Sequence, residues 1–307
     1  MTVLVFGAAG FVGRNLVKKL AEEQHNVVAS DVVEDPFNGS FVYRKVDILD
    51  GNQVLEAVKK IDVIVHLAAS PLTVSLQDPA RNMKVNLEGT LNILDAARKS
   101  DVNQVVYSSA SSVVGSVRSN PVDENHLCEP KTPYAVAKKA CEDYLRVYNE
   151  LYGLRYLVFR FFNVYGPWQT HNSGALIPVL HRNLSEGKEL QVYGDGSNTR
   201  DFVYVGDVTD FCCAAIYQHI ENSIINMGTG KGTSIIELID LASELLGTKP
   251  KIAYKPTRPG EISNFVADTA KLVQVFGRKP STPLEEGLKR TFSWLETHDR
   301  LETTNAR

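Results

Sequence analysis

The stretch that decides the fold stands at the N-terminus: Val3-Leu4-Val5-Phe6-Gly7-Ala8-Ala9-Gly10-Phe11-Val12-Gly13. Its apolar start indicates a buried strand, and the three spaced glycines open an amphipathic helix predicted over Val12–Glu22. At these positions Gly7 makes a tight turn, Gly10 lets the backbone approach a diphosphate, and Gly13 lets the helix pack on the strand. The stretch therefore predicts a dinucleotide site at a strand-to-helix turn.

An acidic residue, Asp31, ends the next predicted strand. It follows the glycines by about 20 residues, the separation expected of a carboxylate that holds a ribose 2′-hydroxyl. Such a carboxylate repels a 2′-phosphate, and Glu34 and Asp35 add further negative charge, so the sequence favours NAD over NADP. Asp47 and Ile48, after the third strand, are expected to border the adenine; an equally good interpretation is that this pair only caps a helix.

The order of the remaining segments predicts the fold class. Strands that are apolar throughout alternate with helices as far as Phe159, which is typical of a parallel sheet covered on both faces. We therefore predict an α/β fold, a Rossmann-like doubly wound parallel sheet. After Pro167 the pattern becomes turn-rich, which indicates a smaller, partly interleaved C-terminal α/β substrate lobe. The predicted limits are 1–166 for the NAD-binding domain, rejoined by about 201–227, then 167–297 for the lobe and 298–307 for a frayed tail.

Composition narrows the class of protein. At 307 residues the chain exceeds the usual size of one core, and 43% hydrophobic with 22% charged residues excludes a disordered chain. A net charge of −3 with scattered lysines and arginines predicts no nucleic-acid partner. The absence of a long apolar run and of a signal-like start predicts no membrane segment and a cytoplasmic location. The four cysteines show neither a CxxC pair nor zinc-like spacing, so we expect free thiols and no metal site: Cys128, Cys141, Cys212, Cys213.

A second motif, Tyr134-Ala135-Val136-Ala137-Lys138, begins a predicted helix directly after Pro133. The spacing places both polar side chains on one face of that helix. An ammonium and a cationic nicotinamide nearby are expected to lower the pKa of the phenol and make Tyr134 a proton shuttle beside a hydride acceptor. Serines at the end of the preceding strand, Ser108 to Ser112, complete a predicted catalytic group.

These features together resemble the extended short-chain dehydrogenase/reductase superfamily, and within it the nucleotide-sugar epimerase and dehydratase branch. The resemblance extends to about Leu295 and rests on several further motifs, which are His66–Ala69, Asn86–Thr90, Arg160–Pro167, Arg200–Asp207, Asn226–Gly230 and Arg258–Glu261. His66 itself is interpreted as a packed strand-end residue rather than a base.

The resemblance assigns roles to individual residues. Lys138 would also hold the nicotinamide ribose, and an arginine fork suits the two negative charges of a nucleoside diphosphate. The bulk of Phe265 favours a 2-hydroxyl sugar over a 2-acetamido one. Further cofactor residues implied are Phe11, Val12, Leu67, Ala68, Ala69, Ser108 and Phe161. The implied substrate residues are Asn163, Val192, Tyr193, Arg200, Arg258, Glu261 and Phe265.

The resemblance also implies a reaction, in which NAD takes a hydride from sugar C4 while Tyr134 takes the hydroxyl proton. A 4,6-dehydratase of this branch would carry an Asp-Glu pair, and a decarboxylase a glutamate, where this chain has Ser111-Ser112. Epimerisation at C4 needs no further acid, so the favoured activity is 4-epimerisation of a UDP-sugar of the UDP-glucose/UDP-galactose type. The alternatives are a dehydratase or reductase using the same 4-keto intermediate, and a weakly catalytic NAD- and nucleotide-sugar-binding protein.

Ala110 departs from the pattern of the branch, because epimerases usually carry there the serine or threonine that hydrogen-bonds the sugar 4-oxygen. Either Ser109 or Ser111 takes over that role, or the chemistry differs from simple epimerisation. The resemblance further implies a homodimer formed through two helices, predicted over Asn82–Arg98 and Pro133–Leu151.

Overall fold

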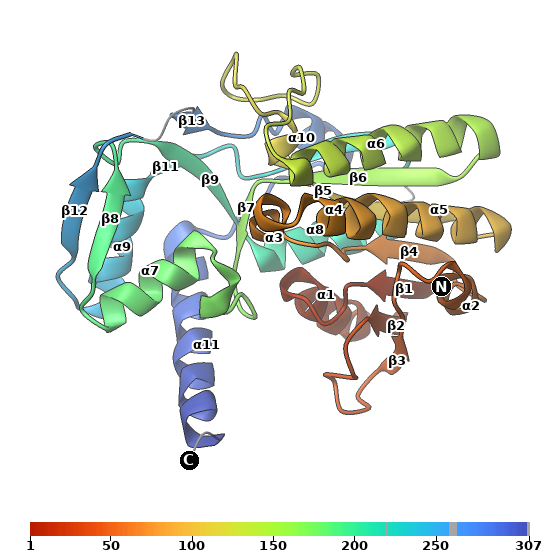
Figure 1. The fold of residues 1–307 in the computed structure, drawn as a ribbon, viewed down its shortest axis with the longest axis horizontal. Helices are drawn as coiled ribbons and strands as arrows, with labels where there is room; N and C mark the ends of the chain where they lie inside the picture. The colour runs from red at the N-terminus through yellow and green to blue at the C-terminus, as the bar shows by residue number, and fades with distance from the viewer. Residues whose placement is uncertain (219, 258–262, 306–307) are drawn as a thin grey trace.

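The structure, a computed structural model, describes residues 1–218, 220–257 and 263–305, with side chains described as far as His298. Its centre is a seven-stranded, wholly parallel sheet in the order β10-β6-β5-β4-β1-β2-β3 (Figure 1). This doubly wound order is the Rossmann-like fold class expected from the alternating pattern. The strands are β1 (Thr2–Phe6), β2 (Asn26–Asp31), β3 (Val42–Lys45), β4 (Val63–His66), β5 (Gln104–Ala110), β6 (Arg155–Phe161) and β10 (Ser223–Met227).

Helices cover both faces of this sheet. Because side chains alternate along a strand, Val3 and Val5 of β1 join one hydrophobic core while Leu4 and Phe6 join the other. The first core packs under α1 (Phe11–Glu22), α8 (Val205–Tyr217) and α10 (Ala270–Phe276). The second packs under α2 (Gly51–Ala57), α5 (Gly89–Lys99) and α6 (Pro133–Tyr152). Both faces of every central strand are therefore buried, which is why these strands are apolar throughout.

The helix predicted over Asn82–Arg98 is divided in the structure. After α3 (Leu72–Gln77) come α4 (Pro79–Met83), a π-helical segment η1 (Lys84–Glu88) and then α5. Within η1 the Asn86 side chain accepts a hydrogen bond from the Ser70 amide at 2.8 Å and donates to the Ser70 carbonyl at 3.0 Å. The helix is thus tied at its wide turn to the loop that follows β4, a contact that local periodicity does not reveal.

The second lobe is built on short strands. In it β9 (Thr199–Tyr204) pairs with β7 (Asn163–Tyr165), β11 (Gly232–Ser234) and β13 (Asn264–Phe265), while β8 (Glu189–Tyr193) pairs with β12 (Lys251–Lys255). Three helices pack on these strands around a third core: α7 (Leu176–Ser185), α9 (Ile235–Leu246) and α11 (Leu284–Asn305). Helix α11 continues beyond Leu295, to which the resemblance of the sequence motifs extends.

A buried carboxylate ties the strands of this lobe together. Asp201 of β9 accepts hydrogen bonds from the amides of Thr229, Gly230 and Ala267 at 2.8, 3.0 and 3.2 Å, and from the Thr229 hydroxyl at 2.7 Å. Burial raises the pKa of this carboxyl although the hydrogen bonds oppose the shift. Its four donors come from two separate loops, so Asp201 fixes the turn after β10 relative to the segment after β13.

The chain passes between the two lobes more than once (Figure 1). Within 201–227, β9 belongs to the second lobe, whereas α8 and β10 join the layers of the seven-stranded sheet. Helix α10, later in the chain, also packs on that sheet. The domain limits at 166/167 and 297/298 stay predictions.

Two tryptophans form a joint between the lobes. The ring of Trp168, whose backbone has φ +73°, lies 5.2 Å from that of Trp294 on α11. The guanidinium of Arg14, on α1, stands 4.6 Å above the Trp168 ring, and the Asn15 amide donates to the Pro167 carbonyl at 2.9 Å. An arginine stacked on an indole in this way stabilises the contact between the first helix and the last.

Three further predictions from composition concern the cysteines, membrane segments and metal sites. All four cysteines lie in the described part of the chain and are free. Among the residues that the structure describes, no helix is long and apolar enough to cross a membrane. The same residues contain no cluster of three or more histidines, cysteines or carboxylates that could hold a metal ion.

Candidate functional site

The glycine turn has the geometry that its sequence requires. Gly7 has φ +82°, and its amide and that of Ala8 donate to the Ser30 carbonyl at 2.9 and 3.0 Å. A Cβ on Gly7 would stand 2.5 Å from the Ala68 nitrogen, and one on Gly13 would stand 2.1 Å from the Gly7 oxygen. Neither position admits a side chain, because in both the neighbour is backbone. The turn therefore brings β1, α1 and the loop after β4 into contact.

The first turn of α1 can receive an anion. Its N-cap, Gly10, has no side chain to cap the helix, and no acidic residue stands in the first turn. A Cβ on Gly10 would have only the Gly7 oxygen nearby, at 3.2 Å, so the space above the turn is open. Unpaired amides at a helix N-terminus bind phosphate groups. The turn therefore fits the diphosphate of a dinucleotide such as NAD.

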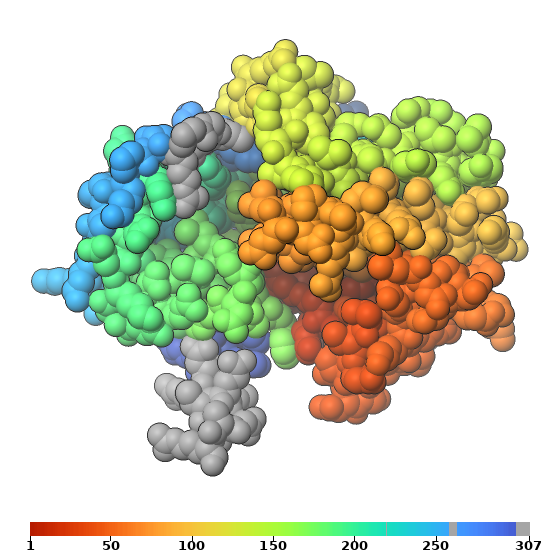
Figure 2. Space-filling model, viewed as in Figure 1, coloured from red at the N-terminus to blue at the C-terminus, as the bar shows by residue number. Residues whose placement is uncertain are grey.

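A cavity of about 940 Å³ opens at the carboxyl ends of β1, β2 and β4. Figure 2 shows it as the hollow between the orange residues around α4 and the red residues near the N-terminus. Crevices at this edge of a doubly wound sheet are the usual place for nucleotides. Eight residues predicted to bind the cofactor line it together, namely Gly7, Gly10, Asp31, Asp47, Ile48, Leu67, Ala68 and Ala69.

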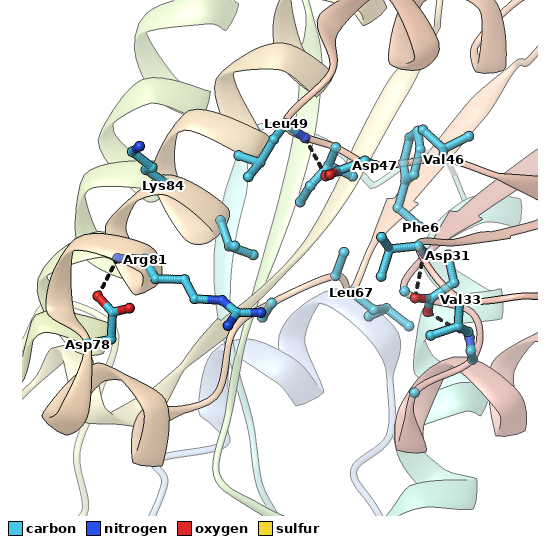
Figure 3. A pocket seen from close by; sticks show the side chains of 18 of the residues that line it. Phe6, Asp31, Val33, Val46, Asp47, Leu49, Leu67, Asp78, Arg81 and Lys84 are labelled. Atoms are coloured by element: carbon cyan, nitrogen blue, oxygen red, sulfur yellow. Dashed lines mark hydrogen bonds between the residues drawn. The ribbon is translucent and has the colours of Figure 1, made fainter.

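The two predicted acidic residues face this cavity (Figure 3). Asp31 accepts hydrogen bonds from the amides of Ala9 at 3.0 Å and Val32 at 2.8 Å, which hold its carboxylate at the end of β2. Asp47 accepts from the Leu49 amide at 2.9 Å, whereas the helix α2 is capped by Asp50. The helix-cap interpretation of Asp47 is therefore wrong. Its position in the cavity wall is compatible with the other interpretation, a contact with the adenine.

Sequence reasoning missed three basic residues that also line the cavity: Arg14, Arg81 and Lys84. Arg14 follows the last glycine directly, so its place on α1 could have been read from the motif. Burial lowers its pKa, and the charge of Asp31 partly offsets that effect. Arg81 and Lys84 stand on α4 and η1, about 50 residues beyond Asp31, and no local pattern connects them with the glycine turn.

The predicted catalytic pair lies on the buried side of α6. Lys138 is 2% exposed, and its Nζ donates to the Ser108 carbonyl at 2.7 Å. The same Nζ stands 4.7 Å from the centre of the Tyr107 ring and 5.8 Å from that of the Tyr134 ring. Thr132 caps this helix, and Pro133 occupies its first turn, so the start of the helix is fixed where Tyr134 stands. The structure thus joins the helix to the end of β5.

The pKa values of this pair are shifted by burial. Burial lowers the pKa of Lys138 to about 8, with Cys141 and Glu142 opposing the shift. Burial also raises the pKa of Tyr134 to about 12. In the protein alone the phenol pKa therefore shifts against the expected direction, because loss of hydration disfavours the tyrosinate. The effect expected of a bound nicotinamide stays a prediction. Shifts of this size are common among functional groups.

His66 is a neutral packed residue, as interpreted from the sequence. Burial and the charge of Lys138 lower its pKa to about 3. The Thr90 hydroxyl donates to the Asn86 carbonyl at 2.6 Å and lies 2.9 Å from His66 Nε2. Because that hydroxyl has only one proton to give, Nε2 carries the hydrogen and donates to it. His66 therefore connects β4 to η1 and α5.

The predicted serines differ in their partners. The Ser109 hydroxyl donates to Glu142 at 2.6 Å, and Glu142 forms two hydrogen bonds to Arg160, at 2.8 and 3.0 Å. Both ion-pair partners are almost wholly buried. Ser109 is thereby directed away from the cavity and into this ion pair. The signal that was missed is the four-residue spacing that places Glu142 on the same face of α6 as Lys138.

The other residues of this segment lie where β5 ends. The Ser108 hydroxyl donates to the His66 carbonyl at 3.1 Å. Ala110 is the last residue of the strand, and Ser111 begins the 3-10 turn η2 (Ser111–Val113) with its side chain buried. Helix α6 packs on this turn. Ser111 and Tyr134 are thus carried by two elements in contact, and Ser111 is a predicted serine that is not engaged by Glu142.

The predicted substrate residues are distributed over the second lobe. The Asn163 amide donates to the Asp201 carbonyl at 3.1 Å, and Arg200 donates to the Thr199 carbonyl at 2.9 Å. Phe265 packs on Phe162 with ring centres 5.1 Å apart. Val192 lies in the core of this lobe, beside the half-buried Tyr193. Two more predicted residues, Arg258 and Glu261, lie outside the described residues. The remaining predicted cofactor residues do not line the cavity: Phe11, Val12, Gly13, Ser108, Tyr134, Lys138 and Phe161.

The chain is similar to proteins of known family. A model of the NAD-dependent epimerase/dehydratase family matches residues 3–228. A putative UDP-glucose 4-epimerase of Methanocaldococcus jannaschii is 35% identical, over 97% of this chain and 99% of the relative. The structure of UDP-glucose 4-epimerase from Thermotoga maritima with UDP-glucose superimposes with a TM-score of 0.90 at 32% identity, over 97% of this chain and 99% of that one. The Thermus thermophilus UDP-glucose 4-epimerase complex with NAD has a TM-score of 0.88 at 32% identity, covering 96% and 99%.

Similar proteins with other activities are nearly as close. A UDP-N-acetyl-α-D-glucosaminuronate decarboxylase of Bacillus cytotoxicus is 31% identical over 95% of this chain and 97% of the relative. A dTDP-glucose 4,6-dehydratase structure from Streptomyces venezuelae has a TM-score of 0.89 at 28% identity, covering 98% of both chains. Overall similarity therefore does not distinguish epimerisation from decarboxylation or dehydration, and the reaction has to be inferred from the residues of the site.

Proposed function

The chain belongs to the NAD-dependent epimerase/dehydratase family, and we propose that within this family it catalyses the 4-epimerisation of a UDP-sugar of the UDP-glucose/UDP-galactose type. The observation that carries the proposal is the composition of the strand end that faces α6. Tyr134 and Lys138 supply a proton shuttle there, while Ser111 and Ser112 stand where an elimination or decarboxylation would need a carboxylic acid. Epimerisation is the reaction that these groups can complete.

The residues of the chain divide the work as follows. The glycine turn and Asp31 bind NAD, whose chemistry when bound is reversible hydride transfer. As the tyrosinate, Tyr134 accepts the proton of the sugar 4-hydroxyl during oxidation, and as the phenol it returns that proton during reduction. Its burial favours the protonated phenol, so the return of the proton is the harder direction.

Lys138 supports this harder direction. Its ammonium, held by the Ser108 carbonyl, favours the tyrosinate that forms when Tyr134 returns the proton. We assign the hydrogen bond to the sugar 4-oxygen to Ser111 rather than Ser109, because Ser109 is bonded to Glu142. Ser111 then makes the hydrogen bond that Ala110, the preceding residue, has no hydroxyl to make.

The substrate is proposed from the second lobe. Arg200, with Arg258, would bind the two charges of the diphosphate, and Glu261 the hydroxyls of the uridine ribose. Asn163, Val192 and Tyr193 complete this part of the site. Phe265, buried against Phe162, favours a sugar with a small C2 substituent.

A product assay tests the proposal. Purified protein is incubated separately with UDP-glucose, UDP-galactose, UDP-N-acetylglucosamine and UDP-glucuronate, and the products are separated. We expect interconversion of the first two without net reduction of NAD. Loss of water, loss of carbon dioxide or no turnover with any of the four rejects the proposal.

Two tyrosine variants test the role of Tyr134. Tyr134→Phe should lose turnover while it retains NAD, because only the transferable proton is removed. Tyr144 lies on the same helix and is 40% exposed, so Tyr144→Phe is the matched control and should keep turnover. An active Tyr134→Phe protein shows that another group moves the proton.

Two further predictions concern assembly and location. We propose that α4, η1 and α6 pair with those of a second copy, because an apolar groove lies between Pro79, Met83 and Leu87 on one side and Val136 and Ala140 on the other. Met83 and Val136 are 46% and 53% exposed in the single chain. A sedimentation measurement that gives a monomer contradicts this. The cytoplasmic location stays a prediction of the sequence.

A further inference from the structure

The cofactor cavity has two facing walls. One is formed by the glycine turn and Asp31, and the other by α4 and the start of η1. In Figure 3 the Arg81 side chain extends from α4 across the opening toward Leu67, whereas the Lys84 side chain extends away from the middle of the cavity. Arg81 therefore places a guanidinium in the cavity on the wall opposite the glycine turn and Asp31.

The charged groups that line this cavity are mostly engaged by the chain itself. The carboxylates of Asp31, Asp47 and Asp78 accept hydrogen bonds from backbone amides. The Arg14 Nε donates to the Ala9 carbonyl at 2.9 Å, and its guanidinium packs on Trp168. Within the described part of the chain, the Arg81 side chain has no hydrogen bond or ion pair. Its charge is available to a ligand.

We propose that Arg81 binds the diphosphate of NAD from the side opposite the N-terminus of α1 and slows the release of the cofactor. A diphosphate carries two negative charges, and the N-terminus of α1 offers neutral backbone amides to it. A guanidinium binds phosphate oxygens through two parallel hydrogen bonds. With Arg81 on one side and the helix on the other, the diphosphate is held from both walls.

This position also explains why the residue belongs on α4. The π-helical turn that follows is fixed by Asn86 to the loop after β4, the loop that Gly7 contacts. Arg81 is thus carried by an element anchored to the glycine turn itself, so its reach across the opening is set by the fold. The inference rests on NAD as the cofactor and is independent of the sugar chemistry.

Release of NAD from the holoenzyme tests the proposal without an activity assay. Bound NAD is followed after addition of an enzyme that destroys free NAD. Arg81→Gln should release NAD about 10 to 100 times faster than the unchanged protein, the effect of one charge-assisted hydrogen-bonded pair. Arg81→Lys, which keeps the charge but not the fork, should be intermediate. Added salt should speed release from the unchanged protein more than from Arg81→Gln.

Lys99→Gln is the matched control. It removes the same charge from an exposed side chain at the end of α5, which is not part of the cavity lining. Its effect should stay below about twofold, as for other exposed charges. Equal acceleration by Lys99→Gln and Arg81→Gln, or no acceleration by Arg81→Gln in a protein with an unchanged circular dichroism spectrum, overturns the proposal.

A displacement experiment separates diphosphate binding from stacking on the adenine. NAD is displaced from each holoenzyme by ADP or by adenosine. If Arg81 binds the diphosphate, Arg81→Gln weakens NAD and ADP alike, so adenosine displaces NAD at a lower concentration while the concentration of ADP needed is unchanged. If Arg81 stacks on adenine, all three ligands weaken together and neither concentration moves, which rejects the proposal.

Discussion

Two cations are buried at the interface between α6 and the ends of β5 and β6, and they are treated differently. Arg160 forms two hydrogen bonds with Glu142, and although burial opposes its charge, this partner raises the pKa. Lys138 has a carbonyl and two aromatic rings around it, and burial lowers its pKa to about 8. The charge of Arg160 is thus balanced by Glu142, whereas Lys138 can lose its proton within a moderate range of pH.

The difference teaches how one helix face serves two purposes. Tyr134, Lys138 and Glu142 follow one another at intervals of four residues, so all three point toward the same strands. Glu142 completes a structural ion pair with Arg160. Among the residues that the structure describes, Lys138 has no such carboxylate partner, which would hold it in the charged form. A buried cation without a carboxylate costs stability, and such costs are usual at functional sites.

Replacing Lys138 should give the largest effect. Lys138→Met is expected to lower kcat by about 10²- to 10⁴-fold, because the tyrosinate loses the ammonium that favours it. The same change should raise the free energy of unfolding, since an unpaired ammonium leaves the interior. Steady-state kinetics and urea unfolding measure the two quantities. A variant that loses stability along with activity would show that Lys138 is mainly structural.

Breaking the ion pair should have the opposite signature. Glu142→Ala leaves the guanidinium of Arg160 buried without a carboxylate, at a cost of about 3–5 kcal/mol in the free energy of unfolding. The double variant Glu142→Leu with Arg160→Met should recover most of this loss. Urea unfolding of the unchanged protein, Glu142→Ala and the double variant measures these differences in the free energy of unfolding. A loss below about 1 kcal/mol for Glu142→Ala would mean that the pair is not desolvated as its burial indicates.

The pH dependence should separate the two cations further. Lys138 loses its proton in the folded protein near pH 8, below its ordinary pKa of 10.5. As pH rises above about 8, kcat should therefore fall, by at most about tenfold per pH unit. Over the same interval the unfolded chain binds the extra proton, so the free energy of unfolding should rise with pH.

Rate profiles and unfolding curves between pH 7 and 10.5 measure both trends. Lys138→Met is the control, and its unfolding energy should lack this rise. A kcat that stays level through pH 9 would show that the ammonium is not required.

The smallest effect distinguishes the two serines. Ser109→Ala removes one hydrogen bond to Glu142 and should lower the free energy of unfolding by about 1–3 kcal/mol. Ser111→Ala should lower kcat by about 2- to 10-fold, the worth of one hydrogen bond to the substrate. Kinetics and urea unfolding of both variants are compared. A larger drop in kcat for Ser109→Ala than for Ser111→Ala would return the sugar contact to Ser109.

Local patterns predicted the parts of the site that are local. The glycine turn and the Tyr134/Lys138 pair each depend on spacing within one turn or helix, and Asp31 depends on spacing within one strand–helix–strand unit. The sequence was therefore sufficient to predict them. The partner of Ser109 was not predicted, because Glu142 lies 33 residues away and meets it only after the helix docks on the sheet. Arg81 escaped notice for the same reason. The pKa of Tyr134 moved against expectation because it depends on burial, which no motif encodes.

The joint between the lobes has a consequence for spectroscopy. The chain contains two tryptophans, and both lie in this joint with their rings 5.2 Å apart. Ultraviolet emission selectively excited in indole therefore reports on one place in the molecule, the contact of α11 with the segment after β7. The Arg14 guanidinium stacks on one of these indoles and also borders the cofactor cavity. Tryptophan emission should therefore change when a ligand in the cavity moves Arg14.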